Sequence, residues 1–165
     1  MRILILLVVF MMTQDVSAQG SAVGRKCEND WARFGKTCYK HIAEKKTWAE
    51  AEEYCISLGG NLAAIHSAQT QDFLKKLGRS KDGTYLRTWI GAHDATQDFT
   101  WFWSDGSKFD YKAWHSGEPN NKERAEKCAE MNFGAEVLWN DARCSTKLNF
   151  VCQTGAKLSF SSSED

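Results

Sequence analysis

Residues 115–128 read HSGEPNNKERAEKC and contain Pro119, the only proline in a chain of 165 residues. The proline lies between a carboxylate, Glu118, and an amide, Asn120. This stretch closes a long polar segment, residues 105–126, that has few strand signals and stops just before a cysteine. Long loops inside compact domains usually carry function or lack order. The loop is therefore the first place to look for a binding site.

The chain starts with a positive charge, an apolar run over residues 3–12 and small residues that end at Ala18. This order is typical of a secretory signal, and the run is about half of the roughly 20 residues that span a bilayer. We therefore expect an extracellular protein with no membrane insertion. Its expected parts are a signal peptide (1–18), a flexible leader (19–26), one domain (27–154) and a disordered tail (155–165).

The cysteine content agrees with export. An even number of cysteines in a secreted chain suggests a set of disulfides, although the spacing alone does not choose among the possible pairings. A zinc cluster is disfavoured because no C-x2-C pair exists. The six cysteines are Cys27, Cys38, Cys55, Cys128, Cys144 and Cys152.

The charge balance argues against a nucleic-acid partner. The chain has 21 basic and 21 acidic residues, so it has no overall positive field to hold a polyanion. The local run of Lys75, Lys76, Arg79 and Lys81 is most simply the solvated face and end of a helix.

The pattern of the chain predicts an α+β domain. Thr47 and Glu50 form a capping box ahead of a helix that stops at Gly59, and Ser67 can cap a second helix that ends at Gly78. Short segments rich in aromatic and β-branched residues follow, as expected for strands. Strand-like segments are residues 36–43, 85–94, 99–107, 128–133, 136–141 and 149–154.

Oxygen ligands concentrate in three places near two of the cysteines. Taken singly, each place is ordinary turn chemistry or a solvated charge. Together they form a set of carboxylates and amides, which suits calcium because this ion takes about six to eight oxygen ligands. The candidate ligands are Glu118, Asn120, Glu126, Asn140 and Asp141.

Several motifs in order resemble the C-type lectin-like domain, in its long form with an additional amino-terminal cysteine pair. The resemblance covers about residues 27–154, and the layout is most similar to small soluble lectins of fish. The matching residues are Cys27, Cys38, Cys55, WIGAHD (89–94), WFWSDGS (101–107), EPN (118–120), Glu126 before Cys128, WND (139–141) before Cys144, and FVCQ (150–153).

The resemblance implies a fold and a metal site. The fold has two helices packed on short antiparallel sheets, a long calcium-binding loop and three disulfides, Cys27–Cys38, Cys55–Cys152 and Cys128–Cys144. Calcium is expected on the five candidate ligands, with a cis bond before Pro119. A second, auxiliary calcium site would fall near Asp94, Asp98 and Asn121, where a neutral amide replaces the usual aspartate.

The resemblance also implies a function. The five calcium ligands would bind sugar as well, and the EPN order goes with mannose, N-acetylglucosamine and fucose, whereas QPD goes with galactose. We therefore expect a secreted, calcium-dependent lectin for glycans on cell or microbial surfaces, with a role in innate immunity. A non-covalent homo-oligomer is expected to supply avidity.

Three other classes of function compete with this expectation. An enzyme is disfavoured because the histidines are scattered and the chain has no H-E-x-x-H or G-x-S-x-G motif. Ice binding on the same fold is the main alternative, although the chain shows no regular threonine array. A venom-type interaction module without sugar binding is the other alternative. The scattered histidines are His41, His66, His93 and His115.

Overall fold

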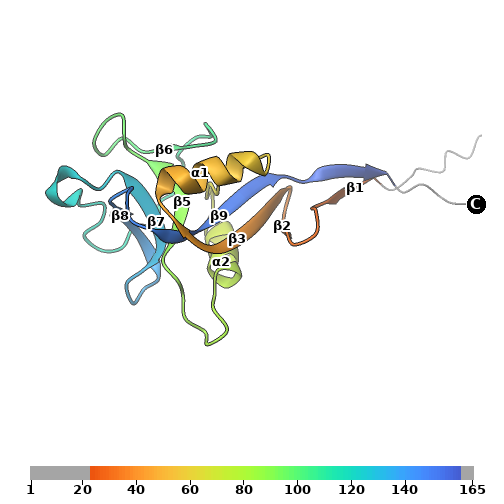
Figure 1. Ribbon diagram of the computed structural model, residues 1–165, viewed down its shortest axis with the longest axis horizontal. Coiled ribbons are helices and arrows are strands. Elements are labelled where there is room, and N and C mark those ends of the chain that lie inside the picture. Colours follow the sequence, from red (N-terminus) through yellow and green to blue (C-terminus); the bar gives the residue numbers. More distant parts are fainter. Residues whose placement is uncertain (1–22, 161–165) are drawn as a thin grey trace, which may run out of the picture.

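The computed structural model describes residues 23–160 (Figure 1), so the expected signal peptide lies outside the described residues. The elements are β1 (Val23–Lys26), β2 (Ala32–Phe34), β3 (Thr37–Lys46), α1 (Trp48–Ser57), β4 (Asn61–Leu62), α2 (Ala68–Leu77), β5 (Thr88–His93), β6 (Phe102–Trp103), the short 3-10 helix η1 (Lys122–Arg124), β7 (Cys128–Phe133), β8 (Leu138–Ala142), β9 (Leu148–Gly155) and β10 (Lys157–Phe160).

The main sheet confirms the expected α+β class. Its strands follow the order β2-β3-β9-β5-β7-β8, with β4 added to β9 and β6 added to β5. The pairs are antiparallel except for β5 and β9, which run parallel, so the sheet is mixed rather than wholly antiparallel. In Figure 1, α1 lies above the β3–β9 pair and α2 lies below it.

Both helices begin where the sequence predicts. The Thr47 hydroxyl accepts from the Glu50 backbone N–H, and the Glu50 carboxylate accepts from the Thr47 backbone N–H, which completes the capping box of α1. The Ser67 hydroxyl caps α2 by accepting from the Thr70 backbone N–H. Across residues 23–160, neither helix is long and apolar enough to cross a membrane.

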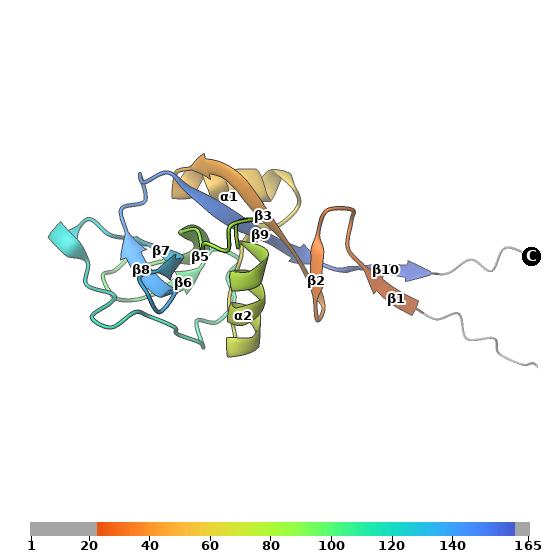
Figure 2. The ribbon, with the colours of Figure 1, turned by 90° about the horizontal axis from the view of Figure 1, so that it is seen from below.

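The ends of the described chain form a second, two-stranded sheet. β1 pairs with β10 in antiparallel register, Val23 opposite Phe160 and Lys26 opposite Lys157. Residues 23–26 and 157–160 were expected to be a flexible leader and a disordered tail, so the structure differs from this expectation. The reason is that each short segment shows little strand pattern alone, and the backbone ladder forms only when both are brought together. Figure 2 shows this arm at one end of the molecule.

Three disulfides tie the elements together. They are Cys27–Cys38, Cys55–Cys152 and Cys128–Cys144. These are the pairings that the family resemblance implies. The last one links the start of β7 to the residues just after β8, so it clamps the strand that carries Asn140 and Asp141.

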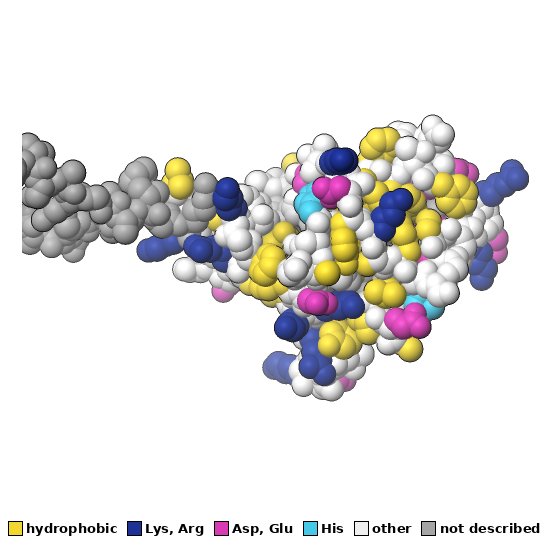
Figure 3. Space-filling view, turned by 180° about the vertical axis from the view of Figure 1, so that it is seen from behind, with side chains coloured by type: hydrophobic (Ala, Val, Ile, Leu, Met, Phe, Trp, Pro, Cys, Tyr) yellow, Lys and Arg dark blue, Asp and Glu magenta, His cyan; other side chains and the backbone are white. Residues whose placement is uncertain are grey.

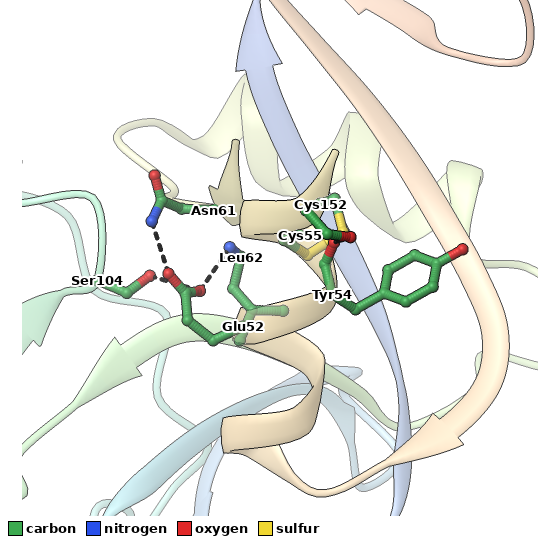
Figure 4. The surroundings of a disulfide bond; sticks show 8 residues. Glu52, Tyr54, Cys55, Asn61, Leu62, Ser104 and Cys152 are labelled. Carbon is green, nitrogen blue, oxygen red and sulfur yellow. Dashed lines mark hydrogen bonds between the residues drawn. A yellow bond between two sulfur atoms is a disulfide. The ribbon is translucent and has the colours of Figure 1, made fainter. Parts of the chain in front are cut away.

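Glu52 joins α1 to β4 and to the residue after β6, near the disulfide between Cys55 and Cys152 (Figure 4). Its Oε1 accepts from Asn61 Nδ2 at 2.6 Å, and its Oε2 accepts from the Leu62 backbone N–H at 2.7 Å and from Ser104 Oγ at 3.0 Å. The packing of Leu62 and Ser104 also explains why position 91, in WIGAHD, is a glycine. A Cβ on Gly91 would lie 2.8 Å from both the Leu62 carbonyl oxygen and Ser104 Oγ, too close for any side chain.

Replacing Glu52 is therefore expected to destabilise the fold. Glu52→Ala leaves three donors without their acceptor, and we expect the free energy of unfolding to fall by about 1–3 kcal/mol. Urea denaturation of the disulfide-intact protein measures this. Glu53→Ala, on the exposed side of α1, is the matched control and is expected to change stability by less than about 0.5 kcal/mol. Equal effects of the two changes would show that the Glu52 contacts contribute nothing.

Candidate functional site

Trp139 anchors the long polar loop to the sheet. Its side chain is fully buried, its ring packs edge-on against Trp103 and Trp114, and its Nε1 donates to Gln71 Oε1 at 2.8 Å. Its backbone N–H donates to the Ala113 carbonyl, and its carbonyl accepts from the His115 N–H, both at 2.8 Å. The loop is thus held against β8 just before it reaches Glu118.

Asp141 then holds the tip of the loop. Its carboxylate is 0% exposed, and its Oδ1 accepts from the Asn120 backbone N–H at 3.0 Å while its Oδ2 accepts from the Asn121 N–H at 2.6 Å. The same Asn120 N–H also contacts Glu118 Oε2 at 3.1 Å. The bond between Glu118 and Pro119 is cis. The backbone N–H of Asn120 therefore lies between the carboxylates of Glu118 and Asp141.

Glu126 joins the group from the far end of the loop. Its Oε2 accepts from the Lys122 backbone N–H at 3.1 Å, and its own N–H donates to Asn121 Oδ1 at 3.3 Å. Between these contacts the chain is strained, because Asn121, Glu123 and Arg124 all have left-handed φ angles, 46°, 56° and 55°. Left-handed conformations of residues other than glycine are costly and gather at binding sites.

Burial and nearby negative charge raise the pKa of the two loop glutamates, Glu118 and Glu126. Burial is the main cause that raises the pKa of Glu118 to about 7, and the hydrogen bond with Asp141 and the negative charges of Asp141 and Glu126 add to it. Burial also raises the pKa of Glu126, and the charge of Asp141 adds to that shift. A site that is short of positive charge in this way favours a bound cation.

The donor set fits a hard divalent cation in its chemistry but is not gathered around one point. All candidate ligands present oxygen, which suits calcium. Within residues 23–160, however, no three His, Cys, Asp or Glu side chains are gathered as a group that could hold one metal ion. Both Asp141 oxygens and one Glu126 oxygen accept backbone N–H groups. Their remaining lone pairs are the ones available to an ion.

Asn140 is placed differently from the other four candidates. Its side chain is 7% exposed, and its Nδ2 donates to Glu130 Oε1 at 2.8 Å. Glu130 in turn is paired with Arg87. Sequence reasoning missed both residues. For Glu130 the available signal was a charged residue in the strand-like segment CAEMNF, which forms the largely buried strand β7.

A family model for the C-type lectin domain matches residues 44–154. The chain belongs to the C-type lectin domain family. Two relatives show how much of the chain the likeness covers. Ladderlectin of Oncorhynchus mykiss is 44% identical over 119 residues, which are 72% of this chain and 63% of the relative. The galactose-specific lectin nattectin of Thalassophryne nattereri is 41% identical over 148 residues, which are 87% of this chain and 92% of the relative. The chain thus spans less than two thirds of ladderlectin.

Solved structures of C-type lectin domains and their relatives show the same fold. The herring type II antifreeze protein matches with a TM-score of 0.75 and 34% identity, covering 79% of this chain and 100% of the other. The carbohydrate-recognition domain of cow CD23, determined with a GlcNAc2Man3 oligosaccharide, matches with a TM-score of 0.72 and 34% identity, covering 81% and 99%. The fold is therefore shared by a protein named for ice and by one solved with a sugar.

In this C-type lectin domain, Lys127 lies against Asp98, a candidate ligand of the auxiliary calcium site. Lys127 Nζ contacts Asp98 Oδ1 at 2.5 Å, and Asn121 Nδ2 donates to Asp98 Oδ2 at 3.0 Å. Asp94 is buried, and its Oδ2 accepts from the Phe99 N–H at 2.7 Å. Because an ammonium group and an amide already neutralise and bind Asp98, we expect no second ion there.

The raised pKa of Glu118 predicts how the stability of the metal-free domain depends on pH. The folded pKa of about 7 lies above the ordinary 4.5, so between these values the folded state binds more protons than the unfolded chain, and stability falls as pH rises. In EDTA we expect the melting temperature to drop from about pH 5 to about pH 8, and to drop less in Glu118→Gln. Glu126 acts in the same direction. A melting temperature that rises equally in both proteins over this range would contradict the prediction.

Proposed function

We propose that this protein is an exported, calcium-dependent carbohydrate-binding protein that prefers mannose-type sugars. The observation that supports this most is that Glu118 of the loop and Asp141 of β8 accept from the same Asn120 N–H, while burial and nearby negative charge raise the pKa of both Glu118 and Glu126. In Figure 1 this loop lies at the end opposite the β1–β10 arm, and within it Asn120 is exposed and Glu118 is partly exposed.

The residues supply both halves of a hydrogen-bonding scheme for a diol. A carboxylate only accepts hydrogen bonds, whereas an amide whose oxygen binds a metal still donates through its NH2 group. Glu118 with Asn120, and Glu126 with Asn140, therefore form two acceptor–donor pairs. Calcium, when bound, would contribute direct coordination of two neighbouring hydroxyl oxygens. On the Asn140 side one N–H already goes to Glu130, so a single N–H is left for a sugar.

The sugar class follows from the order of Glu118 and Asn120. In the C-type lectin family the EPN order goes with equatorial 3- and 4-hydroxyls, as in mannose. One of the relatives, nattectin, is named as galactose-specific. Galactose is accordingly the competing ligand against which the proposal is tested. The natural targets in this proposal are glycans on cell or microbial surfaces, bound by several copies of the chain because single sites of this kind are weak.

Other partners and chemistries have less support. Figure 3 shows Lys and Arg side chains gathered on one lower lobe, where α2 and the loop after it lie, while the rest of that face is mixed. Such a local cluster is too small to neutralise the many phosphates that a nucleic-acid site contacts. A disulfide-linked interaction module would need a spare cysteine, and all six cysteines of the chain are paired within it.

Binding to mannose is expected to need calcium. The protein should be retained on a mannose resin in calcium and eluted by excess EDTA, because the ligand set consists of oxygen atoms that a chelator outcompetes. Calorimetry should give one calcium per chain, since the Asp98 carboxylate is already paired with the Lys127 ammonium. Retention in EDTA would refute the calcium dependence. Binding to galactose resin alone would keep a lectin but reject the mannose preference.

Exchanging the acceptor and the donor is expected to change the sugar preference. The double change Glu118→Gln with Asn120→Asp keeps Pro119, the net charge and one carboxylate, so calcium should still bind. A mannose diol would then face unmatched groups, each costing about 1–3 kcal/mol. Competition by free mannose and free galactose against one immobilised glycan measures the ratio. An unchanged ratio with intact calcium binding would mean that these two residues do not set specificity.

Ice binding remains the alternative on the same fold, supported by the likeness to the herring antifreeze protein. Thermal hysteresis measured with calcium, with EDTA and with added mannose separates the two functions. Strong hysteresis without retention on any sugar resin would favour ice over sugar.

A further inference from the structure

A buried glutamate lies behind the candidate calcium ligand Asn140. Glu130 on β7 is 0% exposed and stands opposite Asn140 in the β7–β8 ladder. Its Oε1 accepts from Asn140 Nδ2 at 2.8 Å. Arg87 donates its Nε to Glu130 Oε2 at 2.7 Å and its Nη2 to Oε1. The carboxylate thus binds a guanidinium on one side and the amide of Asn140 on the other.

Arg87 is itself held in place on both sides. It precedes β5, whose Trp89 pairs with Glu130 in the sheet. Its guanidinium carbon lies 5.6 Å from the centre of the Phe133 ring. A guanidinium that binds a carboxylate through two parallel hydrogen bonds is a rigid contact as well as a charge pair. Glu130 therefore has little freedom to turn away from Asn140.

The chemical consequence concerns which end of the Asn140 amide faces the site. A side-chain amide has one oxygen that accepts and one nitrogen that donates, and a carboxylate paired with arginine can only accept. The nitrogen must therefore face Glu130, and the oxygen is turned to the other side. If the partner could also donate, the amide could rotate by half a turn and present its NH2 group to a cation instead.

We propose that Glu130, held by Arg87, is a positioning residue that orients the Asn140 amide with its oxygen toward the calcium. The proposal rests on the proposed function, since it concerns a ligand of the same site. A purely stabilising role is a weaker explanation, because buried ion pairs contribute little net stability compared with apolar residues of the same size. A fixed acceptor behind a ligating amide has a specific effect on metal affinity.

Glu130→Gln tests the proposal. The single oxygen of glutamine can accept from Arg87, which leaves its NH2 group toward Asn140 and favours the reversed amide. We expect calcium affinity, measured by calorimetry, to fall by about 10- to 100-fold. The same change at Glu53, an exposed residue of α1, is the matched control and is expected to leave the affinity unchanged. Equal affinity in Glu130→Gln and the unmodified protein overturns the proposal.

A double-mutant cycle shows whether the effect passes through Asn140. Asn140→Ala removes the amide, so adding Glu130→Gln to it should weaken calcium binding by less than about twofold further. A general loosening of the fold would instead lower the affinity by the same factor in both backgrounds, and that result rejects the positioning role. Near-UV circular dichroism in EDTA checks that each variant is folded.

A measurement on the unmodified protein keeps the test valid if the variants do not fold. In EDTA the Asn140 side-chain NH2 protons are expected to exchange slowly with water by NMR, because one of them is bound to the buried Glu130 carboxylate. Asn140 NH2 protons that exchange as fast as those of an exposed asparagine would overturn the proposal. An unmodified protein that binds no calcium rejects the proposed function as well, whereas one that binds calcium as tightly after Glu130→Gln rejects only the role of Glu130.

Discussion

The burial of Trp139 is the constraint on which the architecture of the site depends. Its ring lies in an aromatic cluster, and its indole N–H finds an acceptor in Gln71. An indole that is buried and hydrogen-bonded has one stable position. Because the backbone of the same residue pairs with both Ala113 and His115, the long loop is fixed where Trp139 is fixed. A largely polar loop thus gains order from the apolar core, against which its Phe109, Tyr111, Ala113 and Trp114 pack.

Asn140 and Asp141, which follow Trp139 in β8, place an amide and a carboxylate beside the ordered loop. Strand β8 continues from Trp139 into Asn140 and Asp141, and the disulfide at Cys144 follows. Asp141 is buried and uses its oxygens on backbone N–H groups of the loop tip. This brings the loop carboxylates close to a charge that is shielded from water. Crowded carboxylates in a partly buried place are stable only with protons or a cation, and this instability suits the site to a metal.

Charged residues around the site differ in what they do. The Lys127 ammonium forms an ion pair with Asp98, so the charge of this carboxylate is balanced within the chain. At the other side, Arg87 compensates Glu130, which in turn binds an amide of the site. These two pairs leave the charges of Glu118, Glu126 and Asp141 as the ones that an external ion can balance. Asp98 and Glu130 are thus compensated within the chain and do not need an external ion.

The sequence alone determined the class of fold, the helix starts, the disulfide-rich character and the motif residues of the candidate site. These follow from local rules: capping, periodicity, cysteine number and the short motifs EPN and WND. Only the tertiary structure decided the β1–β10 arm, the parallel pairing of β5 with β9, and the roles of Glu130 and Lys127. Each of these depends on contacts between segments far apart in the chain. No local pattern reports such a contact, because the partner of a strand or a charge is chosen by how the whole chain packs.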